Sequence, residues 1–333
     1  MGNCFQKINK SSPSSEIVPA DMLKLKPLPS PLPPAITLYG PSNCPITMYI
    51  RFALSYKPVS VQFVNSNTLS DMFLDSPVLQ FGSERVSGSP VTILGYLDSK
   101  FPAPAVGRRR TAAAAAAIVE VVALQHRSVT WHVERVVTWA EDLVTRKGIG
   151  RGDRKVGTTR MEVKKFGKRY GELLEVMLEH ARMEERVVFP VLEKADRGLP
   201  KAANADHARD LPIMNGINED IKAFGVLDSG NPVYLEALKN LSTRLKTLQK
   251  HCHEHFQDEE RKLLPLMEAV DLNKGQQERL LEQCFEVMHG THSHLFRFFI
   301  EGLCPQDAMH YLDLVSSSID REKVLSMFST ILE

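Results

Sequence analysis

The stretch HARMEERVVFP, residues 180–190, decides the fold, because the chain repeats its pattern as HFQDEERKLLP at residues 255–265. In each copy a histidine precedes a glutamate by four positions, and the same Glu-Arg-x-x-apolar-Pro tail follows. Residues four apart share one face of an α-helix, so an imidazole and a carboxylate reach one metal ion or two adjacent ions. A single His-x-x-x-Glu pair is common on solvated helix surfaces. Two copies with matching tails indicate an internal repeat whose halves form one site.

The sequence around this repeat predicts helices from residue 111 to the C-terminus. The alanine run 112–117 has the highest helix propensity and offers nothing to a strand. We expect four long helices, at about 111–146, 160–195, 204–224 and 232–270. Helices of this length joined by short connections predict an antiparallel four-helix bundle. We expect extra C-terminal helices beyond it, one at about 274–302 and one or two short helices within 308–332.

Two more histidines extend the repeat into a complete pattern. His126 lies near the middle of the first predicted helix, and His207 lies near the start of the third. The order His, His-x-x-x-Glu, His, His-x-x-x-Glu over residues 111–270 resembles the hemerythrin-like, or HHE cation-binding, family. The resemblance implies a non-haem di-iron centre, with the two glutamates as bridges. Its implied metal ligands are His126, His180, Glu184, His207, His255 and Glu259.

The chain departs from the oxygen-carrying members of that family at Leu211, where they place a second histidine one turn after the first. One iron therefore lacks a ligand. Four neutral imidazoles and two carboxylates supply minus two against plus four from a diferrous pair, so we expect a solvent-derived bridge and an exchangeable position. Glu185 and Glu260 lie about 100° round the helix from the ligands, which makes them poor candidates. Such a site suits iron, oxygen or redox sensing, or iron handling, better than reversible oxygen carriage.

Mixed imidazole and carboxylate ligation favours iron or manganese over structural zinc. The preference for iron over manganese comes from the family resemblance. His251, one turn before His255, is an alternative fifth imidazole. The remaining histidines invite a second site, but no carboxylate-bearing repeat joins them, so we expect packing roles for His132, His289, His292, His294 and His310.

The region before the bundle alternates short strand and helix patterns. Strands are predicted at 36–39, 59–64, 78–81 and around Val86, and helices at 46–56 and 90–100. This order, over about 35–102, resembles the thioredoxin-like N-terminal domain of glutathione transferases and glutaredoxins. The fold class is therefore multidomain, a small α/β domain followed by an all-α part.

That second resemblance implies a thiol or glutathione site. Cys44 stands where a glutaredoxin carries its nucleophile, at a helix start whose dipole would lower the thiol pKa. Pro77 matches the cis-proline segment, and Ser89 matches the glutathione-contacting serine. Thr47 replaces a resolving cysteine, and Gly88 replaces the usual acidic residue before the serine. Three readings stay open: a packing or docking module, a glutathione-dependent thiol transferase or oxidoreductase, and a scaffold whose metal is structural.

Composition sets the remaining expectations. Forty-one basic and forty acidic side chains leave a net charge of +1, which gives no nucleic-acid footprint. Five scattered cysteines without a Cys-x-x-Cys pair fit a reducing, cytoplasmic compartment. The apolar stretch 112–124 contains Glu120 and is shorter than the roughly 20 residues of a membrane helix.

The N-terminus carries a pattern of its own. Gly2 and Cys4 suit N-myristoylation and palmitoylation, although Gln6 occupies the usual Ser or Thr position. Acylation would anchor the chain to the cytoplasmic face of a membrane, and an ordinary disordered start is the alternative. The expected layout is a Pro- and Ser-rich tether at 1–34, a thioredoxin-like domain at 35–105, the metal-binding bundle at 111–270 and a helical extension at 271–333.

Overall fold

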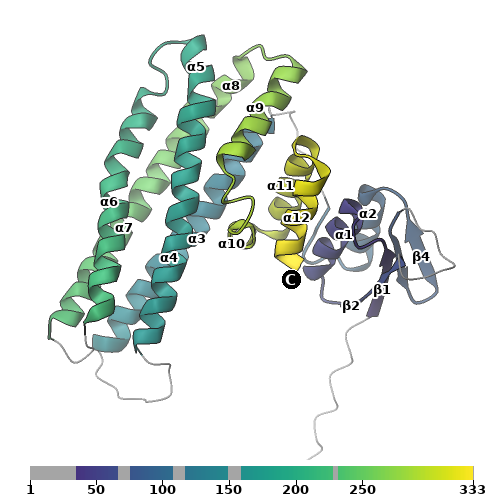
Figure 1. The fold of residues 1–333 in the computed structure, drawn as a ribbon, viewed down its shortest axis with the longest axis horizontal. Coiled ribbons are helices and arrows are strands. Elements are labelled where there is room, and N and C mark those ends of the chain that lie inside the picture. Colours follow the sequence, from purple (N-terminus) through teal and green to yellow (C-terminus); the bar gives the residue numbers. More distant parts are fainter. Residues whose placement is uncertain (1–34, 67–75, 108–116, 149–158, 228–231, 333) are drawn as a thin grey trace, which may run out of the picture.

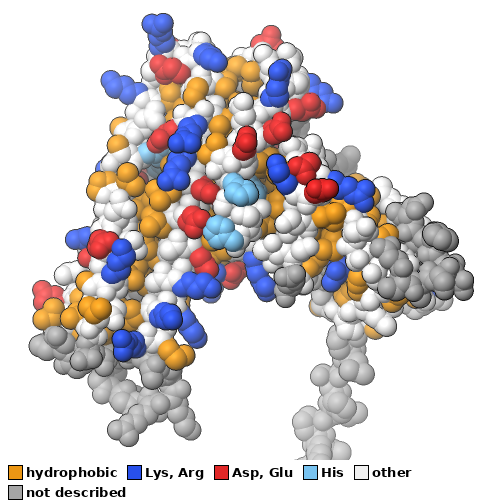
Figure 2. Space-filling model, viewed as in Figure 1, with side chains coloured by type: hydrophobic (Ala, Val, Ile, Leu, Met, Phe, Trp, Pro, Cys, Tyr) orange, Lys and Arg blue, Asp and Glu red, His pale blue; other side chains and the backbone are white. Residues whose placement is uncertain are grey.

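The structure is a computed structural model, and it describes residues 35–66, 76–107, 117–148, 159–227 and 232–332. Figure 1 shows a long helical bundle and a small α/β unit, with the last helices of the chain between them. Acidic and basic side chains are interspersed along the bundle on the face drawn in Figure 2, in keeping with the balanced composition. Among the described residues, no helix is both long and apolar enough to cross a membrane.

The α/β unit has the expected order of strands and helices. Its elements are β1 (Ala35–Gly40), α1 (Pro45–Ser55), β2 (Ser60–Asn65), β3 (Val78–Phe81), β4 (Glu84–Ser87) and α2 (Pro90–Lys100). The strands form a mixed sheet in the order β2-β1-β3-β4, in which β1 runs parallel to β2 and antiparallel to β3. A parallel pair needs a crossover connection, and α1 supplies it. The side chains of Ile36 and Leu38 on β1 are fully buried.

A buried lysine closes the end of this unit. The Lys57 ammonium donates hydrogen bonds of 2.6 Å to Asp98 Oδ1, to the Phe101 carbonyl and to the Pro104 carbonyl. Asp98 in turn accepts from the backbone N–H groups of Val106 and Gly107. A buried charge needs this degree of pairing, so the network ties the loop after α2 to the loop after α1.

Four long helical segments form the antiparallel bundle that the sequence predicts. Their elements are α3 (Ala117–Gly148), α4 (Thr159–Met183), η2 (Glu184–Val188), α5 (Phe189–Ala195), α6 (Lys201–Val226), α7 (Pro232–Asp258), η3 (Glu259–Leu263) and α8 (Leu264–Ala269). Each segment buries one apolar stripe, as the valines at 122, 129, 133 and 136 do on α3. Residues 111–116 of the predicted first helix lie outside the described residues.

The second and fourth helices are not continuous α-helices, contrary to the sequence prediction. Each widens into a π-helical turn, η2 or η3, that begins at a glutamate of the repeat. The Phe189 N–H donates to the Glu184 carbonyl, and the Leu264 N–H donates to the Glu259 carbonyl, five residues back in each case. The prolines at 190 and 265 lack the N–H that an α-helical turn would need at the next position. The repeated proline therefore marks a repeated π turn.

The C-terminal extension is α9 (Lys274–Val287), α10 (Phe296–Glu301), α11 (Pro305–Ser318) and α12 (Arg321–Leu332). The single helix predicted at 274–302 is wrong, because residues 288–295 form turns. The Glu179 carboxylate on α4 accepts hydrogen bonds from Gly290 N and from Thr291 N and Oγ1, and this contact holds the turns against the bundle. At the other end, Phe328 of α12 meets Tyr49 of α1 edge to face. The extension therefore contacts both parts of the chain.

Candidate metal centre

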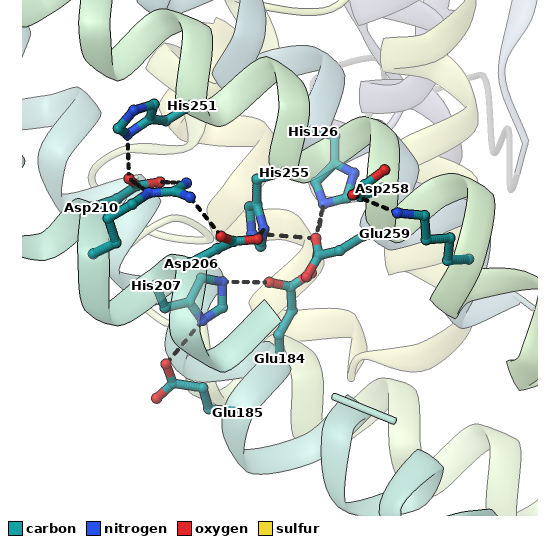
Figure 3. A network of polar contacts seen from close by, with 12 residues as sticks. His126, Glu184, Glu185, Asp206, His207, Asp210, His251, His255, Asp258 and Glu259 are labelled. Atoms are coloured by element: carbon teal, nitrogen blue, oxygen red, sulfur yellow. Dashed lines mark hydrogen bonds and ion pairs between the residues drawn. The ribbon is translucent and has the colours of Figure 1, made fainter. Parts of the chain in front are cut away.

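The six predicted ligand residues come together inside the bundle. Figure 3 shows His126, His207, His255, Glu184 and Glu259 converging from the bundle helices. Their donor atoms form two groups, and within each group all atoms lie within 4.8 Å of one another. One group is His126, His180, Glu184 and Glu259, and the other is Glu184, His207, His255 and Glu259. Both glutamates are common to the two groups, which is the arrangement that two bridged cations need.

Every imidazole turns its Nε2 atom toward a carboxylate. His126 Nε2 lies 3.5 Å from Glu184 Oε1 and 3.3 Å from Glu259 Oε2. His180 Nε2 and His207 Nε2 each lie 3.4 Å from Glu184 Oε2, and His255 Nε2 lies 3.5 Å from Glu259 Oε2. The two oxygens of Glu184 thus face different imidazoles, as a bridging carboxylate would.

The inner atoms of the site lack hydrogen-bond partners within the described part of the chain. They include Nε2 of His126, His180 and His255, Glu184 Oε2, and both carboxylate oxygens of Glu259. A buried polar atom without a partner costs about 1–3 kcal/mol, and native proteins rarely leave several together. Lone pairs of four imidazoles and two carboxylates aimed at one space fit cations, so the donor set matches the metal that the sequence predicts.

The outer nitrogen of each imidazole faces an oxygen. His126 Nδ1 lies 3.0 Å from Glu260 Oε1, and His207 Nδ1 lies 2.9 Å from Glu185 Oε1. His180 Nδ1 lies 2.9 Å from Gln125 Oε1, and His255 Nδ1 lies 3.5 Å from Asp206 Oδ2. The carboxylates of Glu260 and Glu185 hold the proton on Nδ1 of His126 and His207 and leave Nε2 free to bind metal. His255 Nδ1 has no hydrogen-bond partner among the described residues.

Glu185 and Glu260 therefore have a role that the sequence analysis did not find. They stand outside both ligand groups, as expected, yet each contacts a ligand imidazole. Each glutamate lies in a π turn, one position after a ligand glutamate, and contacts the outer Nδ1 atom of an imidazole on another helix. Their two charges balance the plus two left by a pair of divalent ions, so a hydroxide bridge is not required for neutrality.

Burial and the neighbouring carboxylates together set the protonation of the inner groups. Burial lowers the pKa of His207, but the hydrogen bond to Glu184 and its charge outweigh this and raise the pKa to about 9, and the carboxylates likewise raise the pKa of His126, so a cation would have to displace a proton from each ring. Burial lowers the pKa of His180 to about 3, so its imidazole is neutral and suited to metal ligation. Burial, followed by the nearby Glu184 charge, raises the pKa of Glu259 to about 7. Two carboxylates in one buried space repel each other, and a cation between them would relieve that repulsion.

A cavity of about 490 Å³ opens between α4, α6 and α7 and reaches the site. The imidazoles of His180, His207 and His255 line it, together with Leu211. Leu211 is 43% exposed, so the position that holds a histidine in oxygen carriers is here an apolar wall beside solvent. The cavity gives small molecules a way in.

Other histidines in the described residues belong to neither ligand group. His251 Nδ1 instead lies 2.8 Å from Asp210 Oδ1 (Figure 3), so it does not act as the alternative fifth imidazole in this arrangement. His132 stacks on Phe298, and burial lowers its pKa to about 3. The stacking of His132 is a packing role of the kind that the sequence predicts.

The residues of the predicted thiol site lie in the α/β unit. Cys44 is buried at the N-cap of α1, and the Ser89 hydroxyl accepts from Thr92 N at the N-cap of α2. The expected cis peptide before Pro77 is wrong, because the cis peptide among the described residues is Ala103–Pro104. Trans is the default for an X–Pro bond. The predicted lipidation sites at positions 2 and 4 lie outside the described residues.

Comparison with known proteins agrees with this geometry. No curated protein and no solved structure matches the chain. Residues 117–267 match the family model described as the Hemerythrin HHE cation binding domain. The match begins at α3, ends within α8 and contains all six residues of the site. The helical bundle of this chain is therefore hemerythrin-like.

Proposed function

We propose that the bundle holds two iron ions and that the chain is a non-haem di-iron protein that senses oxygen or redox state, or handles iron. The single observation that carries this proposal is the pair of ligand groups that share Glu184 and Glu259 around unpaired, buried donor atoms. His126 and His180 would hold one ion, and His207 and His255 would hold the other. Iron bound there would supply one-electron redox chemistry and affinity for dioxygen.

The nature of the donors supports iron or manganese. Imidazole and carboxylate ligands suit these metals, whereas the described site holds no thiolate of the kind that structural zinc prefers. Four inner and outer carboxylates, Glu184, Glu259, Glu185 and Glu260, match the charge of two divalent ions. Burial of a neutral site costs little free energy, and the gain or loss of an electron would leave a net charge in it.

The cavity supports sensing over reversible oxygen carriage. Leu211 stands where oxygen carriers place a second histidine, and it lies beside the cavity that reaches His207 and His255. The ion held by His207 and His255 would keep a position open to exchange with solvent or with a diatomic ligand. The missing histidine thus distinguishes this site from that of the oxygen carriers and supports a sensing or redox role.

Metal analysis of the purified full chain tests the proposal. Protein loaded with ferrous iron without air should contain two irons per chain and absorb in the near-ultraviolet after oxidation. His180→Ala and His255→Ala should lose both the iron and the absorption. His253→Ala is the matched control, because His253 is exposed on the same helix as His255 and belongs to neither ligand group. An iron-free protein, or ligand variants that keep two irons, would contradict the proposal.

For the α/β unit we infer a thioredoxin-like docking module. Its support is the sheet order β2-β1-β3-β4 with α1 as the parallel crossover. The buried Cys44 and the helix-capping Ser89 favour structural roles for these side chains. Glutathione-dependent activity that disappears in Cys44→Ser would replace this inference with an enzymatic one.

A further inference from the structure

The two halves of the metal site differ in one outer partner. In the repeat, Gln125 and Asp206 hold equivalent places, each directly before a histidine ligand on the first or third bundle helix. Asp206 places a carboxylate, which only accepts, 3.5 Å from His255 Nδ1, although the two groups form no hydrogen bond in this structure. Gln125 offers an amide, which accepts through oxygen and donates through nitrogen, to His180. An amide alone does not decide which ring nitrogen of His180 carries the proton.

A line of buried hydrogen bonds continues from Gln125 into the C-terminal extension. Gln125 Nε2 lies 3.4 Å from the Tyr311 hydroxyl on α11. That hydroxyl lies 2.8 Å from His292 Nε2, and His292 Nδ1 lies 2.8 Å from the Met288 carbonyl oxygen. Gln125 and Tyr311 are fully buried, and His292 is 7% exposed.

The far end of this line fixes the direction of every bond in it. The Met288 carbonyl only accepts, so His292 carries its proton on Nδ1. Burial lowers the pKa of His292 to about 4, so the ring is neutral and its Nε2 is an acceptor. Tyr311 must then donate its only proton to Nε2 of His292, and its oxygen accepts from Gln125.

The same assignment of donors and acceptors extends to the ligand His180. Because the Gln125 nitrogen donates to Tyr311, its oxygen faces His180, and His180 must donate from Nδ1. The Nε2 lone pair of His180 is then free and directed at the ligand group. Ring contacts hold Tyr311 in place, since its ring packs on Phe299 and lies parallel to the His292 ring.

We propose that Tyr311 and His292 are positioning residues that act through Gln125 to fix His180 in its metal-binding tautomer. The proposal deepens the proposed function and rests on it. Both residues lie outside the stretch 117–267 that matches the family, so the C-terminal extension of this chain contributes them. These two residues also link the packing of the extension to the state of the metal site.

The tautomers test the proposal without metal. Nitrogen-15 chemical shifts of the imidazole rings in the metal-free full chain should show His180 and His292 both protonated on Nδ1 and unprotonated on Nε2. Tyr311→Phe should turn His180 into a mixture of tautomers. A His292 ring that carries its proton on Nε2, or a His180 tautomer unchanged by Tyr311→Phe, would overturn the proposal.

Iron affinity supplies the second test. Tyr311→Phe removes one hydroxyl and should weaken ferrous iron binding by about 3- to 10-fold, below the roughly 10- to 100-fold loss expected for a direct partner of a ligand. Tyr170→Phe is the matched control, because its buried hydroxyl donates to the Met214 carbonyl and contacts no ligand. Equal affinities in the two variants would overturn the proposal.

A second substitution separates tautomer control from simple packing. In a Gln125→Glu background the carboxylate only accepts, so it fixes the His180 tautomer by itself. Tyr311→Phe should then cause no further loss of affinity, whereas a packing defect would persist and would overturn the proposal. Wild-type protein that binds no iron would refute the proposed function, and the tautomer measurement would still decide whether the line of hydrogen bonds is polarised as stated.

Discussion

Removal of one outer carboxylate charge should weaken metal binding while leaving the inner ligands untouched. Glu185→Gln and Glu260→Gln are suitable substitutions, because a glutamine oxygen can still accept from His207 Nδ1 or His126 Nδ1. Each variant therefore removes charge and keeps the hydrogen bond. The site loses one of the four negative charges that offset two divalent ions.

The structure sets the size of the effect. Loss of an outer partner typically lowers metal affinity roughly 10- to 100-fold. Glu185 is 44% exposed and Glu260 is 45% exposed, so solvent screens both charges. We therefore expect the lower end, about tenfold or about 1.4 kcal/mol for each variant. The two glutamates lie on different π turns and contact different imidazoles, so the double variant should lose about a hundredfold.

Competition with a ferrous chelator of known affinity measures the change. Glu219→Gln is the control, because Glu219 is 70% exposed on α6 and pairs with Lys222 away from the site. The double variant should also shift the absorption of the oxidised centre, since the charge around the metals changes. Iron affinities of Glu185→Gln and Glu260→Gln equal to that of Glu219→Gln would refute the charge-balance argument.

Three further predictions concern other parts of the molecule. Leu211→His should tighten iron binding and reduce the affinity of the oxidised centre for azide, measured spectroscopically, and unchanged azide binding would contradict the open position. Chelation of the metal should lower the unfolding temperature in calorimetry, because a ligand at about 1,000 times its Kd stabilises the folded protein by about 4 kcal/mol. Equal unfolding temperatures for the metal-loaded and the chelated protein would contradict this. Lys57→Ala should destabilise the α/β unit by about 3 kcal/mol in urea unfolding, the low end for a broken buried pair because Asp98 is 25% exposed. Its iron content should match wild type, because Lys57 lies in the α/β unit and belongs to neither ligand group, and an iron loss would contradict this expectation.

The inner site could be predicted from sequence because its residues follow helical spacing. His180 and Glu184 are one turn apart on one segment, and His255 and Glu259 repeat that spacing with the same tail. Spacing of this kind survives small errors in helix boundaries. The third helix begins at Lys201 and not at 204, yet His207 still faces the site.

Outer contacts were harder to predict because they join residues on different helices and in distant segments. Glu185 and Glu260 lie in π turns, and their partners His207 and His126 lie on other helices, so spacing along one helix does not predict these contacts. The bond between Gln125 and Tyr311 joins residues 186 positions apart. The turn at 288–295 forms because Glu179 binds its backbone, and a Cβ on Gly290 would lie 2.6 Å from that carboxylate. Local sequence carries no record of these tertiary contacts.

The internal repeat also predicts that the two metal positions are unequal. Its symmetry holds for the inner ligands and for the pair Glu185 and Glu260, which contact equivalent histidines. It fails at Gln125 and Asp206, where one half has a buried amide held by the extension and the other has a carboxylate that is 29% exposed. Leu211 and the imidazoles of His180, His207 and His255 line one cavity, whereas His126 lines a separate cavity of about 470 Å³ beside Glu260. Both imidazoles of the pair His207 and His255 line the Leu211 cavity, whereas only His180 of the other pair does, so exchange with small molecules should be faster at an ion held by His207 and His255.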